Sequence, residues 1–183
     1  MTPIVYEFNP VERFVAGTVG APGERTFFIQ ARTGSRVVSV VVDKSQVIAL
    51  GERTKIMLRE IKKTDPTIIV KTQEIDDSPL EQPIFEEFRA GVIAMAWDVE
   101  NSVIVYELRE ITSSDDDSQD EVIFDEEDSS VDLLRVHVSP TQAAAFSKRC
   151  LSLANAGRTP CPFCGMPIDP TGHLCPRSNG YRR

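Results

Sequence analysis

The order of three short apolar segments followed by a helix-capping motif occurs twice in this chain of 183 residues. In the first copy, segments 12–19, 26–31 and 37–42 are rich in β-branched and aromatic residues and are separated by turns that contain Gly or Pro. This pattern is typical of antiparallel strands joined by hairpins. Asp43 and Gln46 follow, and an Asp with a Gln three positions later predicts the capping box that opens a helix.

The second copy keeps this order. Apolar segments 88–97, 102–108 and 131–138 precede a second capping box, formed by Ser139 and Gln142. After each capping box, mostly apolar side chains recur at helical spacing. The two sets align residue by residue: Val47, Leu50, Thr54 and Met57 in the first helix, and Ala143, Phe146, Cys150 and Leu153 in the second.

We therefore expect an α+β domain at residues 1–157, built from duplicated βββα halves at 1–63 and 84–157. The strands should form one curved antiparallel sheet with two helices on one face. The proline-containing segment 64–86 bridges the halves, and 68–70 are expected to add a short edge strand. The alternative is a small α+β domain without duplication, because hairpins and capped helices are common in such domains.

Charge is distributed unevenly along the chain. Residues 113–130 contain nine acidic and no basic residues, which exceeds the whole formal net charge of -8. From Lys148 to the C-terminus there are six basic residues and one acidic residue. We interpret the acidic segment as a solvated surface loop. The alternative is that it pairs with the basic tail or with a basic partner, and it lacks the spacing of a calcium loop.

The C-terminal cysteines have the spacing of metal ligands. Cys161 and Cys164 are separated by two residues, and the following Gly165 permits the positive φ of a metal-binding knuckle. His173 and Cys175 complete a set of three cysteines and one histidine. Soft sulfur ligands in a four-coordinate set favour tetrahedral Zn²⁺, and four protein ligands leave no open position for a substrate. The sequence therefore predicts a structural zinc site.

We expect residues 158–183 to form a zinc-binding tail whose folding coincides with metal binding, because so short a segment cannot bury a core. The closing pair of His173 and Cys175 is one residue shorter than the second Cys-x-x-Cys of a zinc ribbon. Asp169 is the expected substitute ligand if the histidine points away. Two alternatives remain open: a redox pair of the first two cysteines, and unliganded surface thiols.

Two further residues have structural interpretations. Cys150 lies on the apolar stripe of the second helix, so we expect a small buried hydrophobic side chain there rather than a ligand. His137 alternates with the apolar residues of segment 131–138, which predicts a surface position on a strand rather than a catalytic role.

The composition excludes some classes of protein. No apolar run approaches about 18 residues, so no transmembrane helix is expected. The first residues lack the basic and then apolar order of a secretory signal. Three of the four cysteines crowd near the C-terminus, which does not suit a distributed disulfide framework. We expect a soluble, cytoplasmic protein without membrane partners.

Residues near both ends of the chain closely resemble one protein family. The similar segments are 8–10, 13–17, 161–165, 169–170, 172–177 and 179–183. The family is an uncharacterised actinobacterial domain of unknown function with a zinc-ribbon-like tail of the form Cys-Pro-x-Cys-Gly…His-x-Cys-Pro. Its members tend to be encoded near a lipid-kinase-like protein and a histidine-phosphatase-like protein, which implies a shared pathway but no reaction. The resemblance supplies no catalytic residues.

The first functional hypothesis is a non-enzymatic adaptor or binding protein with a protein partner. The chain lacks the glycine-rich nucleotide motifs, the nucleophile elbow and the His-Glu-x-x-His metalloprotease motif. With His173 assigned to the metal, only His137 remains for general acid–base chemistry. Enzymatic activity is therefore not the favoured expectation.

Two alternatives belong to other classes. The chain could be an enzyme or sensor for a phosphorylated or nucleotide metabolite, held by arginines on or beside the predicted strands. Those arginines are Arg13, Arg25, Arg32, Arg89 and Arg109. It could instead bind nucleic acid through the basic tail, with aromatic side chains stacked on bases. The tail residues for that role are Phe163, Arg177, Tyr181, Arg182 and Arg183, although the net charge of -8 disfavours it.

Overall fold

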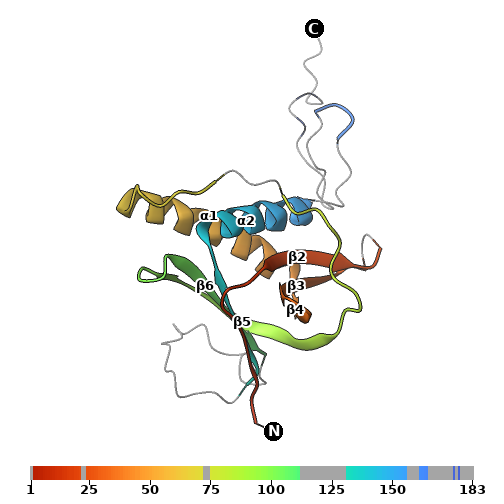
Figure 1. The fold of residues 1–183 in the computed structure, drawn as a ribbon. Helices are drawn as coiled ribbons and strands as arrows, with labels where there is room; N and C mark the ends of the chain where they lie inside the picture. The colour runs from red at the N-terminus through yellow and green to blue at the C-terminus, as the bar shows by residue number, and fades with distance from the viewer. Residues whose placement is uncertain are drawn as a thin grey trace.

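A computed structural model shows two helices packed across one side of a strongly curved seven-stranded sheet (Figure 1). The structure describes residues 2–21, 24–71, 75–111, 131–155 and 161–164, together with 175 and 177. The predicted acidic loop at 113–130 lies outside the described residues. In the described part of the chain, neither helix is long and apolar enough to span a membrane.

The seven strands form one sheet in the order β1-β7-β6-β5-β4-β3-β2. Their bounds are β1 Val5–Phe8, β2 Arg13–Val19, β3 Thr26–Thr33, β4 Arg36–Val42, β5 Glu86–Asp98, β6 Val103–Glu110 and β7 Leu133–Val138. The pairs β1–β7 and β4–β5 are parallel and the others are antiparallel. The expectation of a purely antiparallel sheet was therefore wrong. A helix and a long connection separate β4 from β5, which allows the chain to return in the same direction.

The helices α1 (Lys44–Thr64) and α2 (Pro140–Asn155) begin at the two predicted capping boxes. In α1, the Gln46 side chain accepts a hydrogen bond from the backbone N–H of Asp43 at 2.8 Å. In α2, Ser139 Oγ accepts from the N–H of Gln142, whose side chain accepts from the N–H of Ser139. These contacts satisfy backbone donors that a helix N-terminus otherwise leaves unpaired.

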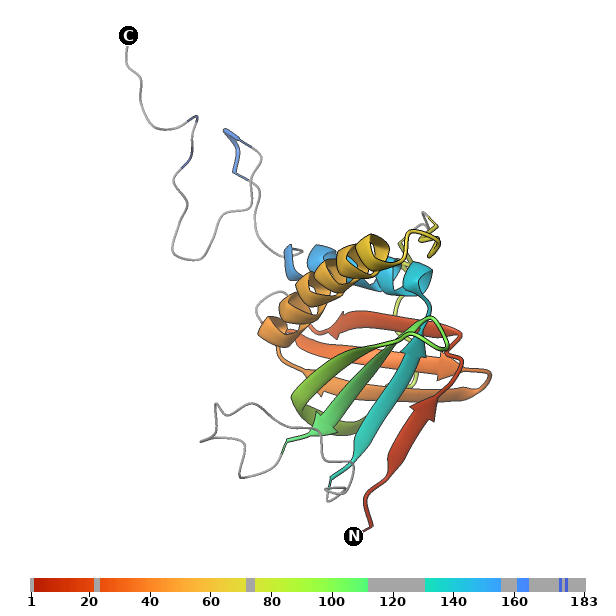
Figure 2. The same ribbon diagram turned by 90° about the vertical axis from the view of Figure 1, so that its left-hand side faces the viewer.

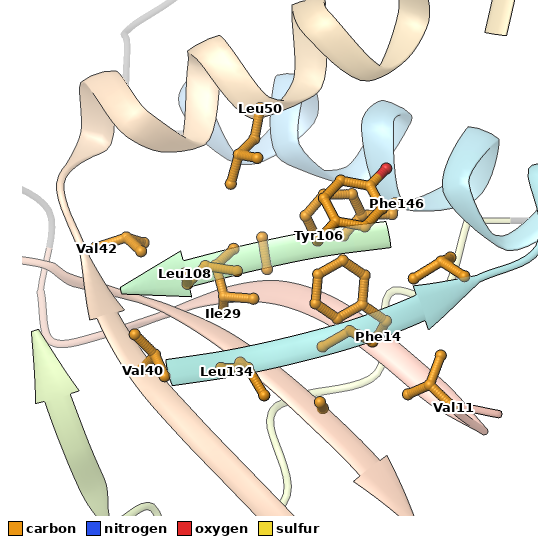
Figure 3. Close-up of a cluster of buried hydrophobic side chains, with 14 of the residues drawn as sticks. Val11, Phe14, Ile29, Val40, Val42, Leu50, Tyr106, Leu108, Leu134 and Phe146 are labelled. Atoms are coloured by element: carbon orange, nitrogen blue, oxygen red, sulfur yellow. The ribbon is translucent and has the colours of Figure 1, made fainter. Parts of the chain in front are cut away.

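The apolar stripes of both helices face a common core. At the centre of this core, Phe146 stacks on Phe14 with ring centroids 4.3 Å apart and meets the edge of Tyr106 at 5.6 Å (Figure 3). The Tyr106 hydroxyl lies 2.9 Å from the Thr54 hydroxyl, so this buried polar pair is satisfied. Cys150 is fully buried, as predicted, and burial raises the pKa of its thiol.

The helices cross closely, as Figure 2 shows from the side. Ser147 Oγ donates a 2.7 Å hydrogen bond to the carbonyl oxygen of Gly51 at this crossing. A Cβ atom at Gly51 would lie 3.0 Å from Leu151 Cγ and 3.1 Å from Cys150 Cβ. The two helix backbones therefore approach this closely because Gly51 has no side chain.

Gly51→Ala is expected to lower the free energy of unfolding by about 1–2 kcal/mol, because the added methyl group overpacks the helix crossing. In an uncrowded helix the same change would stabilise by about 1 kcal/mol, since Ala is the better helix former. The sign of the change in urea denaturation therefore tests the close crossing. Glu52→Ala, at the neighbouring exposed position, is the control and should change stability by no more than about 0.5 kcal/mol.

Residues 75–85, here termed the strap, cover the face of β2, β3 and β4 that lies away from the helices. Leu80 of the strap packs on Val15, Phe28 and Val41 in a second, smaller apolar cluster. A Cβ atom at Gly17 would lie 2.5 Å from the Leu80 side chain, so the strap lies directly on the strand backbone.

Two details of the expected strand set differ from the structure. Strand β1 was not predicted; it pairs with β7 through Tyr6 and Leu134. Residues 68–70 were expected to add an edge strand, but they have no strand structure, and Ile68 packs against the main core instead. Next to this segment, the backbone N–H of Lys71 donates to Thr141 Oγ1 at the start of α2 rather than to a strand.

Candidate metal centre

Three of the four predicted metal ligands come together in the described residues. Cys161 and Cys164 flank a tight turn, and Cys175 returns to the same place. The three Sγ atoms all lie within 4.8 Å of one another, and those of Cys161 and Cys175 are 3.8 Å apart. His173 and the substitute ligand Asp169 lie outside the described residues.

The sulfur separation suits a metal ion better than a disulfide. A tetrahedral ion with Zn–S bonds of about 2.3 Å places its sulfur ligands about 3.8 Å from one another, whereas a disulfide needs about 2.05 Å. The distance between Cys161 Sγ and Cys175 Sγ matches the first value, and all the cysteines are free. The donor set is soft, which favours Zn²⁺ over hard cations such as Mg²⁺ or Ca²⁺. The three thiols are therefore placed to hold one soft metal ion.

The surroundings of Cys161 favour its thiolate form. This side chain is only 5 % exposed, and burial alone opposes ionisation. Hydrogen bonds from the backbone N–H groups of Phe163 and Cys164, together with the neighbouring thiols, outweigh burial and lower the pKa of Cys161. A thiolate is the form that binds a metal. In the described residues Pro162–Cys164 form a turn, whereas a Cys-x-x-Cys redox pair belongs to a βαβ pattern.

The outer side of the turn carries an aromatic side chain. Phe163 is 62 % exposed, and Arg177 Nη1 donates a 3.4 Å hydrogen bond to its carbonyl oxygen. These are the two described residues of the set named for the nucleic-acid alternative. Tyr181, Arg182 and Arg183 lie outside the described residues.

The arginines proposed to hold an anion are mostly paired with carboxylates of the chain itself. The pairs are Arg13–Asp76 at 2.6 Å, Arg32–Glu12 at 3.1 Å, Arg89–Asp43 at 3.2 Å and Arg109–Glu107 at 3.7 Å. Each of these guanidinium groups has a carboxylate partner within the protein, although Glu107 also pairs with Arg135 at 2.7 Å. The ion pairs of these four arginines therefore do not support the metabolite hypothesis.

A buried polar network around Arg149 was missed by the sequence reasoning, which counted this residue only among the basic residues near the C-terminus. Arg149 is 7 % exposed and donates to the carbonyl oxygens of Ala16 at 2.5 Å and Ser78 at 2.9 Å, as well as to that of Asp76. Its Nη1 also lies 3.5 Å from the Asp76 carboxylate. The signal was present, because Arg149 follows Phe146 by three residues and therefore lies beside the apolar stripe of the helix.

Arg13 completes this network. Its guanidinium binds both carboxylate oxygens of Asp76, at 2.6 and 3.1 Å, and donates to the carbonyls of Ser78 and Pro79. The hydrogen bond from Arg13 lowers the pKa of Asp76 to about 2, against the opposing effect of burial. Two arginines from different elements therefore fasten the strap to β2 and α2.

His137 lies on the outer face of β7, opposite the core, as expected. Its Nε2 is 3.1 Å from Glu7 Oε1 on β1, and its side chain is only 13 % exposed, so it is less accessible than predicted. The pair joins β1 and β7 at this edge of the sheet. Among the described residues, no side chain that could act in catalysis forms a hydrogen bond with the pair.

A family model described as "Protein of unknown function (DUF3090)" matches residues 6–175. Neither a curated protein nor a solved structure matches this chain. The match covers the body, the strap and the three cysteines that lie close together. The chain therefore belongs to the DUF3090 family of proteins of unknown function.

Proposed function

We propose that this chain is a structural zinc-binding protein that acts as a non-enzymatic adaptor for a protein partner in the cytoplasm. The observation that carries the proposal is the cluster of three thiols within 4.8 Å of one another. His173 is the proposed fourth ligand, and residues 158–183 are the proposed zinc-binding tail. A site with four protein ligands has no open position, so the ion would hold the tail in shape rather than activate water.

The proposed body is a duplicated βββα domain with halves at 1–63 and 84–157. Three contacts support this duplication. The Nε2 group of Gln46 donates to the carbonyls of Ala90 and Gly91, in the first strand of the other half. The Nε2 group of Gln142 donates in turn to the carbonyl of Val11, at the start of β2. The capping glutamine of each helix thus holds the opposite half.

The metal content of the purified protein tests the zinc proposal. Protein prepared under reducing conditions without added metal is expected to contain one zinc ion per chain by elemental analysis, because three thiolates and an imidazole bind Zn²⁺ strongly. The same preparation should show no stoichiometric iron, nickel or copper. Material that carries no transition metal, and that takes up none when zinc is added, would contradict the proposal.

A further inference from the structure

The two helices carry pockets at matching positions. Each pocket is lined on its helix side by the capping glutamine, an alanine, a large apolar residue and an arginine, at the same spacing. These residues are Gln46, Ala49, Leu50 and Arg53 in α1, and Gln142, Ala145, Phe146 and Arg149 in α2. The α2 pocket has a volume of only about 50 Å³, whereas the α1 pocket has about 190 Å³.

The α2 pocket is small because the chain itself fills this position. Phe146 stacks on Phe14 there, and Arg149 binds the strap. The strap offers this guanidinium one carboxylate, from Asp76, and two backbone carbonyls, from Asp76 and Ser78. Of the two arginines at matching positions, Arg149 therefore already binds an extended acidic segment, the strap.

In the part of the chain that the structure describes, no segment fills the α1 pocket in this way. Arg53 is exposed, and within the described part of the chain no carboxylate forms an ion pair with it. Across from it, Gly91, Ile93 and Met95 of β5 form the other wall. A register shift between Ala90 and Ile93 lies where β5 changes from pairing with β4 to pairing with β6. Such an irregularity disrupts the local pairing and bends the strand.

Helix α1, which lines one side of the pocket, is basic. Helix α1 carries six basic and two acidic residues, all of them exposed. They are Lys44, Arg53, Lys55, Arg59, Lys62 and Lys63 against Glu52 and Glu60. This local excess contrasts with the net charge of -8 of the whole chain. A ligand with negative charge is attracted to this helix in particular.

We propose that the α1 pocket binds an acidic peptide segment of a protein partner. A carboxylate of the peptide pairs with Arg53, as Asp76 pairs with Arg149, and an adjacent apolar group enters between Ile93 and Met95. The volume of about 190 Å³ admits one or two side chains and is smaller than a site for a drug-sized ligand. This inference does not depend on the metal centre; it adds the chemistry of the partner to the adaptor proposal.

The strap sequence itself provides the probe. A synthetic peptide of residues 75–82, Ile-Asp-Asp-Ser-Pro-Leu-Glu-Gln with both ends blocked, is titrated into full-length protein labelled with ¹³C at its methionine methyl groups. The chain has four methionines, and Met95 is the one that lines the pocket. The Met95 signal, assigned with Met95→Leu, is expected to shift and to saturate. The same peptide with Asn in place of its Asp residues should bind about tenfold more weakly.

Variants of the protein distinguish peptide binding in the pocket from general electrostatic attraction to the basic helix α1. Arg53→Gln should weaken peptide binding about tenfold, whereas Arg59→Gln, on the same helix but outside the pocket lining, should leave it within about twofold. Both positions are exposed, so both variants should fold.

Four results would overturn the proposal. The first is a Met95 signal that does not shift on addition of the peptide, and the second is an equal loss of peptide affinity in Arg53→Gln and Arg59→Gln. The third is that acetate binds as tightly as the peptide. The fourth is peptide binding that appears only after Asp115, Asp116 and Asp117 are changed to Asn. The last result would identify the acidic segment of this chain as the occupant. Because the metal analysis uses a different measurement, failure here would leave the zinc proposal intact.

Discussion

Cys175→Ser is expected to reduce the bound zinc from one ion per chain to a trace. Cys175 is buried, and its sulfur lies 3.8 Å from that of Cys161, the separation that two ligands of one tetrahedral zinc ion have. A serine hydroxyl is not ionised at neutral pH and is a harder donor than a thiolate, so the site loses one of its strongest ligands. Structural zinc sites contribute about 10–16 kcal/mol of apparent binding free energy in zinc-finger peptides. This is the binding free energy that the substitution would reduce.

Cys150→Ala is the matched control for this experiment. It removes a thiol from the same chain, but from the core between α1 and α2, and should leave the zinc content at one ion per chain. Cys175→Ser should in turn leave the thermal melting of the body unchanged, because none of the three clustered cysteines belongs to the main core. If Cys175→Ser retains its zinc, or if both variants lose it equally, the three thiols are not the binding site.

The sequence predicted those features that depend on neighbouring residues. Both helices begin at the predicted capping boxes, since a cap needs only a serine or aspartate and a glutamine three positions later. Six of the seven strands lie at predicted segments because their apolar runs end at local turns. The three cysteines were likewise found by their spacing, and the structure brings their sulfur atoms together.

Features that depend on distant residues were missed. Strand β1 has only four residues, and its partner Leu134 lies far along the chain from Tyr6. No local pattern indicates a parallel pair of that kind. The strap is a similar case, because its anchor Asp76 contacts Arg149, which lies 73 residues further along the chain. In the sequence alone, no pattern connects the proline-containing segment 64–86 with Arg149.

Arg149→Met is expected to lower the free energy of unfolding of the body by about 3 kcal/mol, because a buried polar group left without its hydrogen-bond partner costs about 1–3 kcal/mol. Methionine keeps much of the length of the side chain, so the loss of packing is small. The carbonyls of Ala16, Asp76 and Ser78 would lose a shared donor in a place that water scarcely reaches. Asp76 would keep Arg13, so the strap should be weakened at α2 rather than released entirely.

Arg53→Met is the matched control, because Arg53 occupies the corresponding position on α1. It is exposed and forms no ion pair among the described residues, so its replacement should change stability by no more than about 0.5 kcal/mol in urea denaturation. Similar losses for the two variants would show that the arginines act through helix packing in general. A large loss for Arg149→Met alone would show that these corresponding positions of the two helices have different roles: Arg149 fastens the strap, whereas Arg53 contributes little to the stability of the body.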